Sequence, residues 1–220
     1  MPLRLDINDA GFEARFSRFL DARRDAAGDV AEIVAAIIRD VRDNGDAALI
    51  DYTRRFDRFE LTAGTIRVGR DEIEQAAAEC EPAVIKALKS ARARIADYHA
   101  RQMPDDLDYT DAAGVRLGYR WRAVGAAGLY VPGGRGAYPS SVLMNAVPAK
   151  AAGVERLVMV TPAADGELSP YVLAAAAIAG VDEIYRVGGA QAVAALAYGT
   201  ETIRPVDKIT GPGNAYVAQA

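Results

Sequence analysis

Four short apolar segments in the second part of the chain each end at a loop that contains glycine or proline. Their centres lie near residues 129, 158, 185 and 208, and a spacing of about 25 to 30 residues is close to the length of one βαβ unit. Helical patterns separate them, and parallel neighbours in a sheet need a crossover of about a dozen residues or more. The alternation therefore predicts a parallel sheet with right-handed crossovers. Its expected strands are 128–131, 155–161, 182–187 and 206–210, and its helices are 142–147, 171–179 and 190–198.

The first of these strands runs into a loop in which Pro132 is followed by Gly133, Gly134 and Gly136. Glycine has no Cβ, so the backbone N–H groups around it can approach a ligand closely and adopt positive φ without steric cost. A serine of Tyr138-Pro139-Ser140-Ser141 then precedes an apolar helical run and is the expected N-cap of that helix. This order of strand, glycine loop and helix is consistent with a seat for a nucleotide phosphate.

The loops at 132–136, 188–191 and 211–214 follow three different predicted strands. Because the carboxyl ends of parallel strands meet at one edge of a sheet, we expect these loops to converge on one rim, where such sheets bind ligands. Glycine also occurs at these turns for tight connection alone, and that explanation stays open. None of the loops has the Gly-x-Gly-x-x-Gly pattern with an acidic residue at dinucleotide-binding spacing, and the phosphate-loop sequence ending in Lys-Ser/Thr is absent.

The first part of the chain is charged and mainly helical. Apolar residues at helical spacing predict helices over 12–24, 30–43 and 46–56, with Asp29 as the cap of the second. Asn44 and Gly45 are expected to end that second helix, because both residues tolerate the left-handed conformation. The charged residues that close the third helix are expected to form a solvated face: Arg54, Arg55, Asp57 and Arg58.

A β-hairpin is expected where this helical part ends. Residues 66–68 form a possible short strand, and helices are expected over 71–81, with Asp71 as its cap, and over 83–103. Strands at 107–111 and 115–124, joined around Gly114, predict the hairpin, and Trp121 is expected to pack where the hairpin meets the sheet.

The composition changes at this hairpin, which places a domain boundary near residue 123. The expected fold class is α/β. A mainly helical N-terminal region with a β-hairpin, residues 1–122, precedes an incomplete Rossmann-like parallel sheet with helices on both faces, residues 123–220.

The charge balance and the apolar pattern exclude some partners. The 26 Lys and Arg residues are set against 30 Asp and Glu residues, for a net charge of −4 without a basic tract, so nucleic acid is not an expected partner. No apolar run of about 18 residues is present, and the N-terminus lacks the apolar core of a signal peptide. We therefore expect no membrane partner and a cytoplasmic location.

The chain is poor in groups that could carry out chemistry. Cys80 is the single cysteine, which excludes an intrachain disulfide, and its alanine neighbours favour a buried helical thiol over a catalytic one. His99 is the single histidine and is better explained as a hydrogen-bonding group near a helix end than as a base. Catalytic zinc usually needs about three suitable ligands. No metal site or catalytic residue is therefore assigned. The polar residues expected at the rim suit a cofactor cradle better than a reaction centre: Tyr130, Arg135, Tyr138, Ser140, Ser141, Asn145, Gln191, Lys208 and Asn214.

Several long strings in this sequence resemble histidinol dehydrogenases. The most specific are Tyr-Val-Pro-Gly-Gly, Tyr-Pro-Ser-Ser-Val-Leu-Met-Asn-Ala-Val-Pro-Ala, Val-Gly-Gly-Ala-Gln-Ala-Val-Ala-Ala-Leu-Ala-Tyr-Gly-Thr and Lys-Ile-Thr-Gly-Pro-Gly-Asn-Ala-Tyr-Val, which begin at residues 130, 138, 187 and 208. A weaker pattern continues through 41–57 and 98–102. The resemblance covers nearly the whole chain, whereas a histidinol dehydrogenase is about twice as long.

The resemblance implies an enzyme that oxidises L-histidinol through the aldehyde to L-histidine in two NAD-dependent steps, with zinc as a second cofactor and a homodimer as its assembly. Matching by motif places the NAD-contacting residues of the family on Tyr130, Gln191 and Asn214. Tyr130 would stack or hydrogen-bond, Gln191 would hold a ribose or amide, and Asn214 would begin a helix whose N–H groups face phosphates. The family's zinc ligands, acid–base pair and substrate-binding residues belong to a portion after Asn214 that this chain lacks.

The last predicted helix, from Asn214, ends after fewer than two turns, and so short a helix is marginal by itself. We therefore expect the N-terminal half of a histidinol dehydrogenase, with little or no turnover by itself. Three alternatives stay open. They are a non-catalytic nucleotide-binding module that works with a partner chain, a related zinc-dependent dehydrogenase of another small alcohol, and a purely structural remnant.

Overall fold

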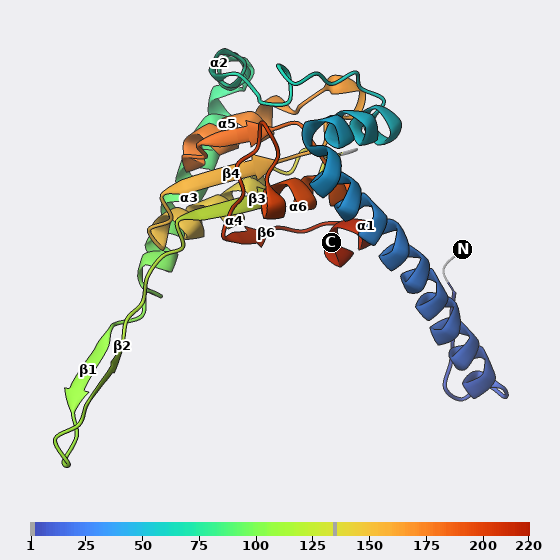
Figure 1. The fold of residues 1–220 in the computed structure, drawn as a ribbon, viewed down its shortest axis with the longest axis horizontal. Coiled ribbons are helices and arrows are strands. Elements are labelled where there is room, and N and C mark those ends of the chain that lie inside the picture. The colour runs from blue at the N-terminus through green and yellow to red at the C-terminus, as the bar shows by residue number, and fades with distance from the viewer. Residues whose placement is uncertain (1–2, 134–135) are drawn as a thin grey trace.

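A four-stranded parallel sheet forms the centre of the molecule, as the strand spacing predicted (Figure 1). The computed structural model describes residues 3–133 and 136–220. In the sheet the strands lie in the order β5-β4-β3-β6, and every neighbouring pair is parallel. Their bounds are β3 Ala126–Tyr130, β4 Arg156–Val160, β5 Glu183–Tyr185 and β6 Lys208–Thr210.

Helices cover both faces of this sheet, because alternate residues of the buried strands point to opposite sides. Val158 and Val160 pack in one apolar cluster with residues of α1 and α6, whereas Leu157 and Met159 pack in a second cluster with the other long helices. The first face is covered by α1 Phe12–Asp57 and α6 Gly189–Tyr198, with the short α7 Ala215–Gln219 beside them. The second face is covered by four helices: α2 Arg70–Glu79, α3 Pro82–Ala100, α4 Pro139–Ala151 and α5 Pro170–Ala179. A 3₁₀ turn, η1 Ala164–Gly166, follows β4.

The helix α1 consists of two helical segments that meet at a kink, where three helices were predicted. The expected interruption before residue 30 is wrong, and Asp29 lies within the helix. The sequence there has no proline, and alanine-rich stretches favour helix. At Gly45 the chain does depart from helical geometry, with φ 52 and ψ −129, but the helix resumes at once. The carboxylate of Glu201 accepts a hydrogen bond from the backbone N–H of Asp46 at 2.8 Å, which satisfies a group that the kink would otherwise leave unpaired.

Two further predicted helix caps, on α4 and α2, are wrong because each helix begins earlier than predicted. The helix α4 begins at Pro139, with Tyr138 as the N-cap and no side-chain cap, so Ser140 lies in the first turn. Proline is suited to the first helical position because its φ is already helical and it has no N–H to satisfy. Similarly, α2 begins at Arg70 after Gly69, so Asp71 lies in the first turn and is not the cap.

The predicted hairpin forms but projects from the rest of the molecule (Figure 1). It pairs β1 Leu107–Thr110 with β2 Arg116–Tyr119 in antiparallel register, and all of its strand residues are exposed. The expected packing of Trp121 against the sheet is wrong. Its side chain is 55% exposed and lies edge-on to the Tyr119 ring, because the hairpin extends away from the sheet layer. A domain boundary near residue 123 stays a prediction.

The two edges of the sheet differ. At the β5 edge, residues 66–68 form a single antiparallel bridge between Arg67 and Tyr185, with Val68 donating to the carbonyl of Ile184 at 2.9 Å. This segment is the short strand expected there, reduced to one bridge. The opposite edge is β6, which pairs only with β3 among the described residues. Within the described residues, no helix is long and apolar enough to cross a membrane.

Candidate nucleotide-binding rim

The carboxyl ends of β3, β5 and β6 bring three loops together, as predicted. Tyr130 is the last residue of β3, and its hydroxyl accepts a hydrogen bond from the backbone N–H of Gly189 at 3.0 Å. Gly211, directly after β6, lies against the same residue. A Cβ at this position would lie 2.1 Å from the carbonyl oxygen of Tyr130, and the φ of Gly211 is +136°. Only glycine fits so close an approach in that conformation.

A pocket of about 510 Å³ opens at this rim. It is large enough for part of a nucleotide, since ligand pockets commonly measure about 300 to 1,000 Å³. Its lining comes from the loops after β3, β4 and β6 and from the start of α4: Tyr130, Pro132, Gly133, Tyr138, Ser141, Pro162, Pro212, Gly213 and Asn214. Two of the three predicted cofactor residues, Tyr130 and Asn214, therefore line one pocket.

Asn214 is the N-cap of α7, as expected. Its Oδ1 accepts hydrogen bonds from the backbone N–H groups of Tyr216 and Val217 at 3.0 and 3.1 Å. Two of the N–H groups that were expected to face phosphates are thus already satisfied by the cap itself. The side-chain NH₂ group makes no hydrogen bond to the described part of the chain, so this exposed amide is the donor that Asn214 offers to the pocket.

Gln191 lies behind the rim and not in the pocket. It occupies the first turn of α6 and is 1% exposed. Its Oε1 is buried without a hydrogen-bond partner among the described residues. A Cβ at Gly189 would lie 2.4 Å from this oxygen, so the amide of Gln191 packs onto the glycine whose N–H binds Tyr130.

The other predicted rim residues are only partly brought together. Asn145 donates to the carbonyl of Ser141 at 2.7 Å and contacts the Thr210 hydroxyl at 3.3 Å, which ties α4 to the end of β6. Lys208 was placed at the rim wrongly, because it begins β6 and pairs with Ala127 near the opposite end of β3. Tyr138 and Ser141 line the pocket, Ser140 does not, and Arg135 and Gly134 lie outside the described residues.

Pro162, a residue of the rim pocket, was not among the predicted rim residues. Pro162 follows β4, and Cβ atoms at Gly133 and Gly188 would lie 2.7 and 2.4 Å from its ring. The glycines in these two loops therefore permit the loops to pack around Pro162. At Gly133 and Gly188, therefore, the glycines are explained by tight packing of the loops, the alternative to ligand binding.

The sequence analysis also missed a polar pair on α1. Asp57 was expected on a solvated face, but its Oδ2 is buried and unpaired among the described residues. Burial raises the pKa of the Asp57 carboxyl, and Arg58 only partly offsets this. Thr53 is fully buried, with an unpaired hydroxyl. The spacing of Leu49, Thr53 and Asp57 at intervals of four was the available signal, because it continues the buried stripe of the helix.

The Tyr130 hydroxyl is held in its protonated form. Burial raises the pKa of Tyr130, the N–H of Gly189 lowers it, and the nearby charge of Asp57 raises it, with a net rise. Since the oxygen accepts from Gly189, the phenolic proton is available to donate to a ligand at neutral pH.

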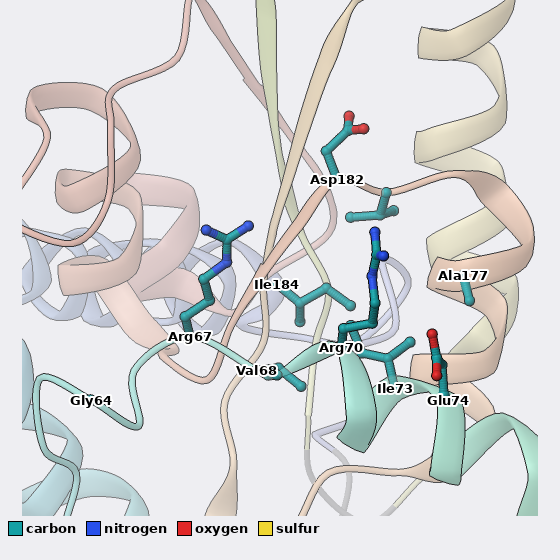
Figure 2. A pocket seen from close by; sticks show the side chains of 11 residues that line it. Gly64, Arg67, Val68, Arg70, Ile73, Glu74, Ala177, Asp182 and Ile184 are labelled. Carbon is teal, nitrogen blue, oxygen red and sulfur yellow. The ribbon is translucent and has the colours of Figure 1, made fainter.

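A second pocket, of about 700 Å³, lies elsewhere (Figure 2). It forms between the first turn of α2, the end of α5 and the start of β5. Figure 2 shows Arg67 and Arg70 on either side of Ile184, with Asp182 nearby. Arg67 and Arg70 are exposed, and none of the predicted cofactor residues lines this pocket.

The described residues offer no zinc centre of their own. Among the side chains that the structure describes, no group of three or more His, Cys, Asp or Glu residues is arranged to hold a metal ion. Cys80 is buried, as predicted, and its Sγ lies 3.3 Å from the carbonyl of Ala76. Burial raises the pKa of this thiol, which disfavours the reactive thiolate. His99 lies near the end of α3, with its ring edge-on to Tyr98.

Comparison with known proteins gives one consistent result. A family model described as histidinol dehydrogenase matches residues 20–220. The chain is 62% identical over 220 residues to a histidinol dehydrogenase of Rhodospirillum rubrum, and 60% identical over 220 residues to one of Bradyrhizobium diazoefficiens. Each alignment covers 100% of this chain and 51% of the relative.

A crystal structure of histidinol dehydrogenase from Elizabethkingia anophelis superposes with a TM-score of 0.81. It is 38% identical, and the match covers 86% of this chain and 43% of that one. The chain thus spans about half the length of the curated relatives it matches.

Proposed function

Because this chain belongs to the histidinol dehydrogenase family, we propose that its rim binds the NAD with which L-histidinol is oxidised, through the aldehyde, to L-histidine. When bound, NAD would supply the hydride acceptor for each oxidation. Tyr130, Gln191 and Asn214 are the proposed cofactor-binding residues. Their contribution is to bind and orient the dinucleotide, and the groups that move protons on the substrate are not assigned to this chain.

One observation carries the proposal: residues that follow different strands meet at a single pocket. The Tyr130 hydroxyl receives the Gly189 N–H at 3.0 Å, and the same tyrosine and Asn214 line a pocket of about 510 Å³. Convergence at the carboxyl ends of parallel strands is where sheets of this kind bind nucleotides.

Polar groups at the rim fit a dinucleotide because several of them lack partners. The Tyr130 proton and the Asn214 amide are donors, which suit phosphate and carbonyl oxygens. The buried Oε1 of Gln191 is an unsatisfied acceptor, which suits a ribose hydroxyl or a carboxamide N–H. Unpaired buried polar atoms are uncommon in folded proteins, so the unpaired Oε1 of Gln191, directly behind the rim, favours binding over tight connection alone.

Zinc does not fit the described residues of this chain, since they contain no group of three ligands. We propose that the zinc ligands and the acid–base pair belong to the part of the relatives' length that has no counterpart here. The chain alone is then expected to give no turnover. A homodimer and a cytoplasmic location are proposed on the same family grounds.

Calorimetric titration of NAD into the 220-residue chain tests this function. Weak binding is expected, with loss of binding in Tyr130→Phe and Asn214→Ala. Tyr109→Phe on the exposed hairpin serves as the control and should bind normally. No binding to the unsubstituted chain would refute a nucleotide site and favour a structural remnant.

An activity assay tests the assignment of the chemistry. The chain mixed with zinc, L-histidinol and NAD is expected to produce no NADH, and clear turnover would contradict the proposal. A nucleotide-binding module that works with a separate chain is the second candidate, favoured by the lack of metal ligands among the described residues. Adding the complementary portion of a family member as a second polypeptide should then restore NADH formation.

A further inference from the structure

One face of the projecting hairpin is made of aliphatic and aromatic side chains. In the antiparallel register, Leu107 lies opposite Tyr119, and Tyr109 lies opposite Leu117. Directly opposite residues share a face of a two-stranded sheet, and alternate residues along each strand share it too. Trp121 continues this face, because its ring packs edge-on against that of Tyr119 with the centroids 6.1 Å apart. These five residues are called the hairpin face below.

The charges of the hairpin strands lie on the opposite face. Asp108 and Arg116 alternate along β1 and β2 with residues of the hairpin face. The Nε of Arg116 donates to the Oδ1 of Asp108 at 2.8 Å, and its Nη2 donates to Oδ2. The two charges are therefore paired within the hairpin, and the hairpin face itself carries none.

No part of the chain that the structure describes buries the hairpin face. Its five residues are between 42% and 55% exposed. Among the described residues, neither apolar cluster of the parallel sheet includes a residue of β1 or β2, and the hairpin extends away from that sheet (Figure 1). A two-stranded hairpin is at best marginally stable in water, so packing of this face against another surface would stabilise it.

The size and chemistry of the hairpin face suit a second copy of this chain. Because the face is uncharged, two copies can meet across a twofold axis without bringing like charges together. Its three half-exposed aromatic rings and two leucines present roughly 500 Å², since a fully buried aromatic side chain covers about 150 to 250 Å². Two such faces would bury about 1,000 Å² in total, which is the lower bound for a specific interface. Tyrosine and tryptophan are also enriched at protein interfaces.

We propose that the hairpin face packs against the same face of a second copy, so that two chains form a dimer. This inference goes beyond the nucleotide site and names the surface of the homodimer that is proposed above on family grounds. The projection of the hairpin leaves the face accessible to a second molecule (Figure 1). An interface of this size predicts a reversible dimer whose fraction depends on chain concentration.

Sedimentation equilibrium and tryptophan fluorescence, measured over the same range of chain concentration, test this inference. Sedimentation should show monomer and dimer in exchange. Trp121 is the single tryptophan of the chain, so its emission reports on the hairpin face and should shift to shorter wavelength as the dimer forms, with the same midpoint. A dimer without this shift would overturn the inference and leave the homodimer itself standing.

A pair of matched variants tests the face directly. Leu117→Glu places a charge on the hairpin face, whereas Thr110→Glu places one on the opposite face, where it lies across from Arg116. Leu117→Glu is expected to weaken dimerisation at least about a hundredfold, because a twofold interface contains the change twice and each lost leucine contact costs about tenfold. Thr110→Glu should change the dissociation constant by less than about threefold. Equal effects of the two variants would contradict the proposed surface.

The test stays decisive if Leu117→Glu does not fold, as judged by circular dichroism, because the fluorescence of the unsubstituted chain needs no substitution. A chain that stays monomeric, with constant Trp121 emission, would overturn the inference. The hairpin face would then be assigned to contact with the part of the relatives' length that has no counterpart here. Titration of NAD tests the nucleotide site separately, so neither failure of the dimer bears on that site.

Discussion

Replacing Tyr130 with phenylalanine should destabilise the fold as well as weaken nucleotide binding. The ring is 5% exposed and stays in place, so no cavity forms. The lost hydroxyl leaves the Gly189 N–H, at the start of α6, without its acceptor. A hydrogen bond contributes about 0.5 to 1.5 kcal/mol, and an unsatisfied buried donor costs about 1 to 3 kcal/mol. Because Gly189 is only partly buried, water can reach the donor, and a loss of about 1 to 1.5 kcal/mol in unfolding free energy is expected.

Urea unfolding followed by circular dichroism measures this loss. With a slope of about 2 kcal/mol per molar urea, the midpoint should fall by about 0.5 to 0.75 M while the slope stays constant. Tyr138→Phe is the control, because Tyr138 lines the same pocket but is 41% exposed. It should shift the midpoint by less than about 0.2 M, as for an exposed hydroxyl.

The result that would refute this reasoning is an equal shift in the two variants. It would mean that the Gly189 N–H gains nothing from Tyr130, and that the loops after β3 and β5 are held together by packing alone.

Three further predictions concern the sheet and its borders. Burial, and then the hydrogen bond to Glu183, raise the pKa of Tyr185 to about 12, so the folded state holds the phenolic proton more tightly than the unfolded state does. The resulting gain in unfolding free energy is present below about pH 10 and is lost as the pH rises towards 12. Thermal melts of Tyr185→Phe should lack that alkaline loss, and a parallel decline in both proteins would contradict the assignment. Gly211→Ala should lower the unfolding free energy by at least about 2 kcal/mol, since a Cβ would lie 2.1 Å from a carbonyl oxygen of β3. Gly114→Ala is the control, with φ +82° but open space around it, and should lower the unfolding free energy by only about 1 kcal/mol. Equal losses in urea unfolding would show that backbone strain alone, and not the steric clash, sets the loss. Burial raises the pKa of the Asp57 carboxyl, so this group stabilises the fold at low pH, and that contribution is lost as the pH rises through the folded pKa. Asp57→Asn should therefore have a higher unfolding free energy than the unsubstituted chain at pH 7 and should lose that advantage in acid. A lower unfolding free energy of the variant at pH 7 would contradict this prediction and argue for a structural role of the carboxylate.

The sheet could be predicted from the sequence because its signals are local. Each of the four strands is a short apolar run that ends at glycine or proline, and each helix has its own apolar period. Convergence of Tyr130 and Asn214 then followed from the parallel pairing of the strands. Boundaries were less certain, as at Pro139, where a proline begins the helix before the serine that was expected to cap it.

What the sequence could not provide depends on contacts between distant segments. The kink at Gly45 is satisfied by Glu201, a residue more than 150 positions away. Asp57 was expected to be solvated because charged residues surround it, and the burial of its Oδ2 arises only when α1 packs on the sheet. Trp121 was expected to be buried on hydrophobicity alone, yet it belongs to a hairpin that extends away from the sheet.

The unequal edges of the sheet have a consequence for solubility. A strand edge with free N–H and C=O groups can template pairing with another molecule, and native proteins often counter this with short strands and lysine. The bridge at Arg67 blocks such pairing beside β5. At the other border, β6 has only three residues and begins with Lys208, whose side chain is exposed. A strand this short that begins with an exposed lysine disfavours edge-to-edge pairing of β6 with the same strand of another molecule.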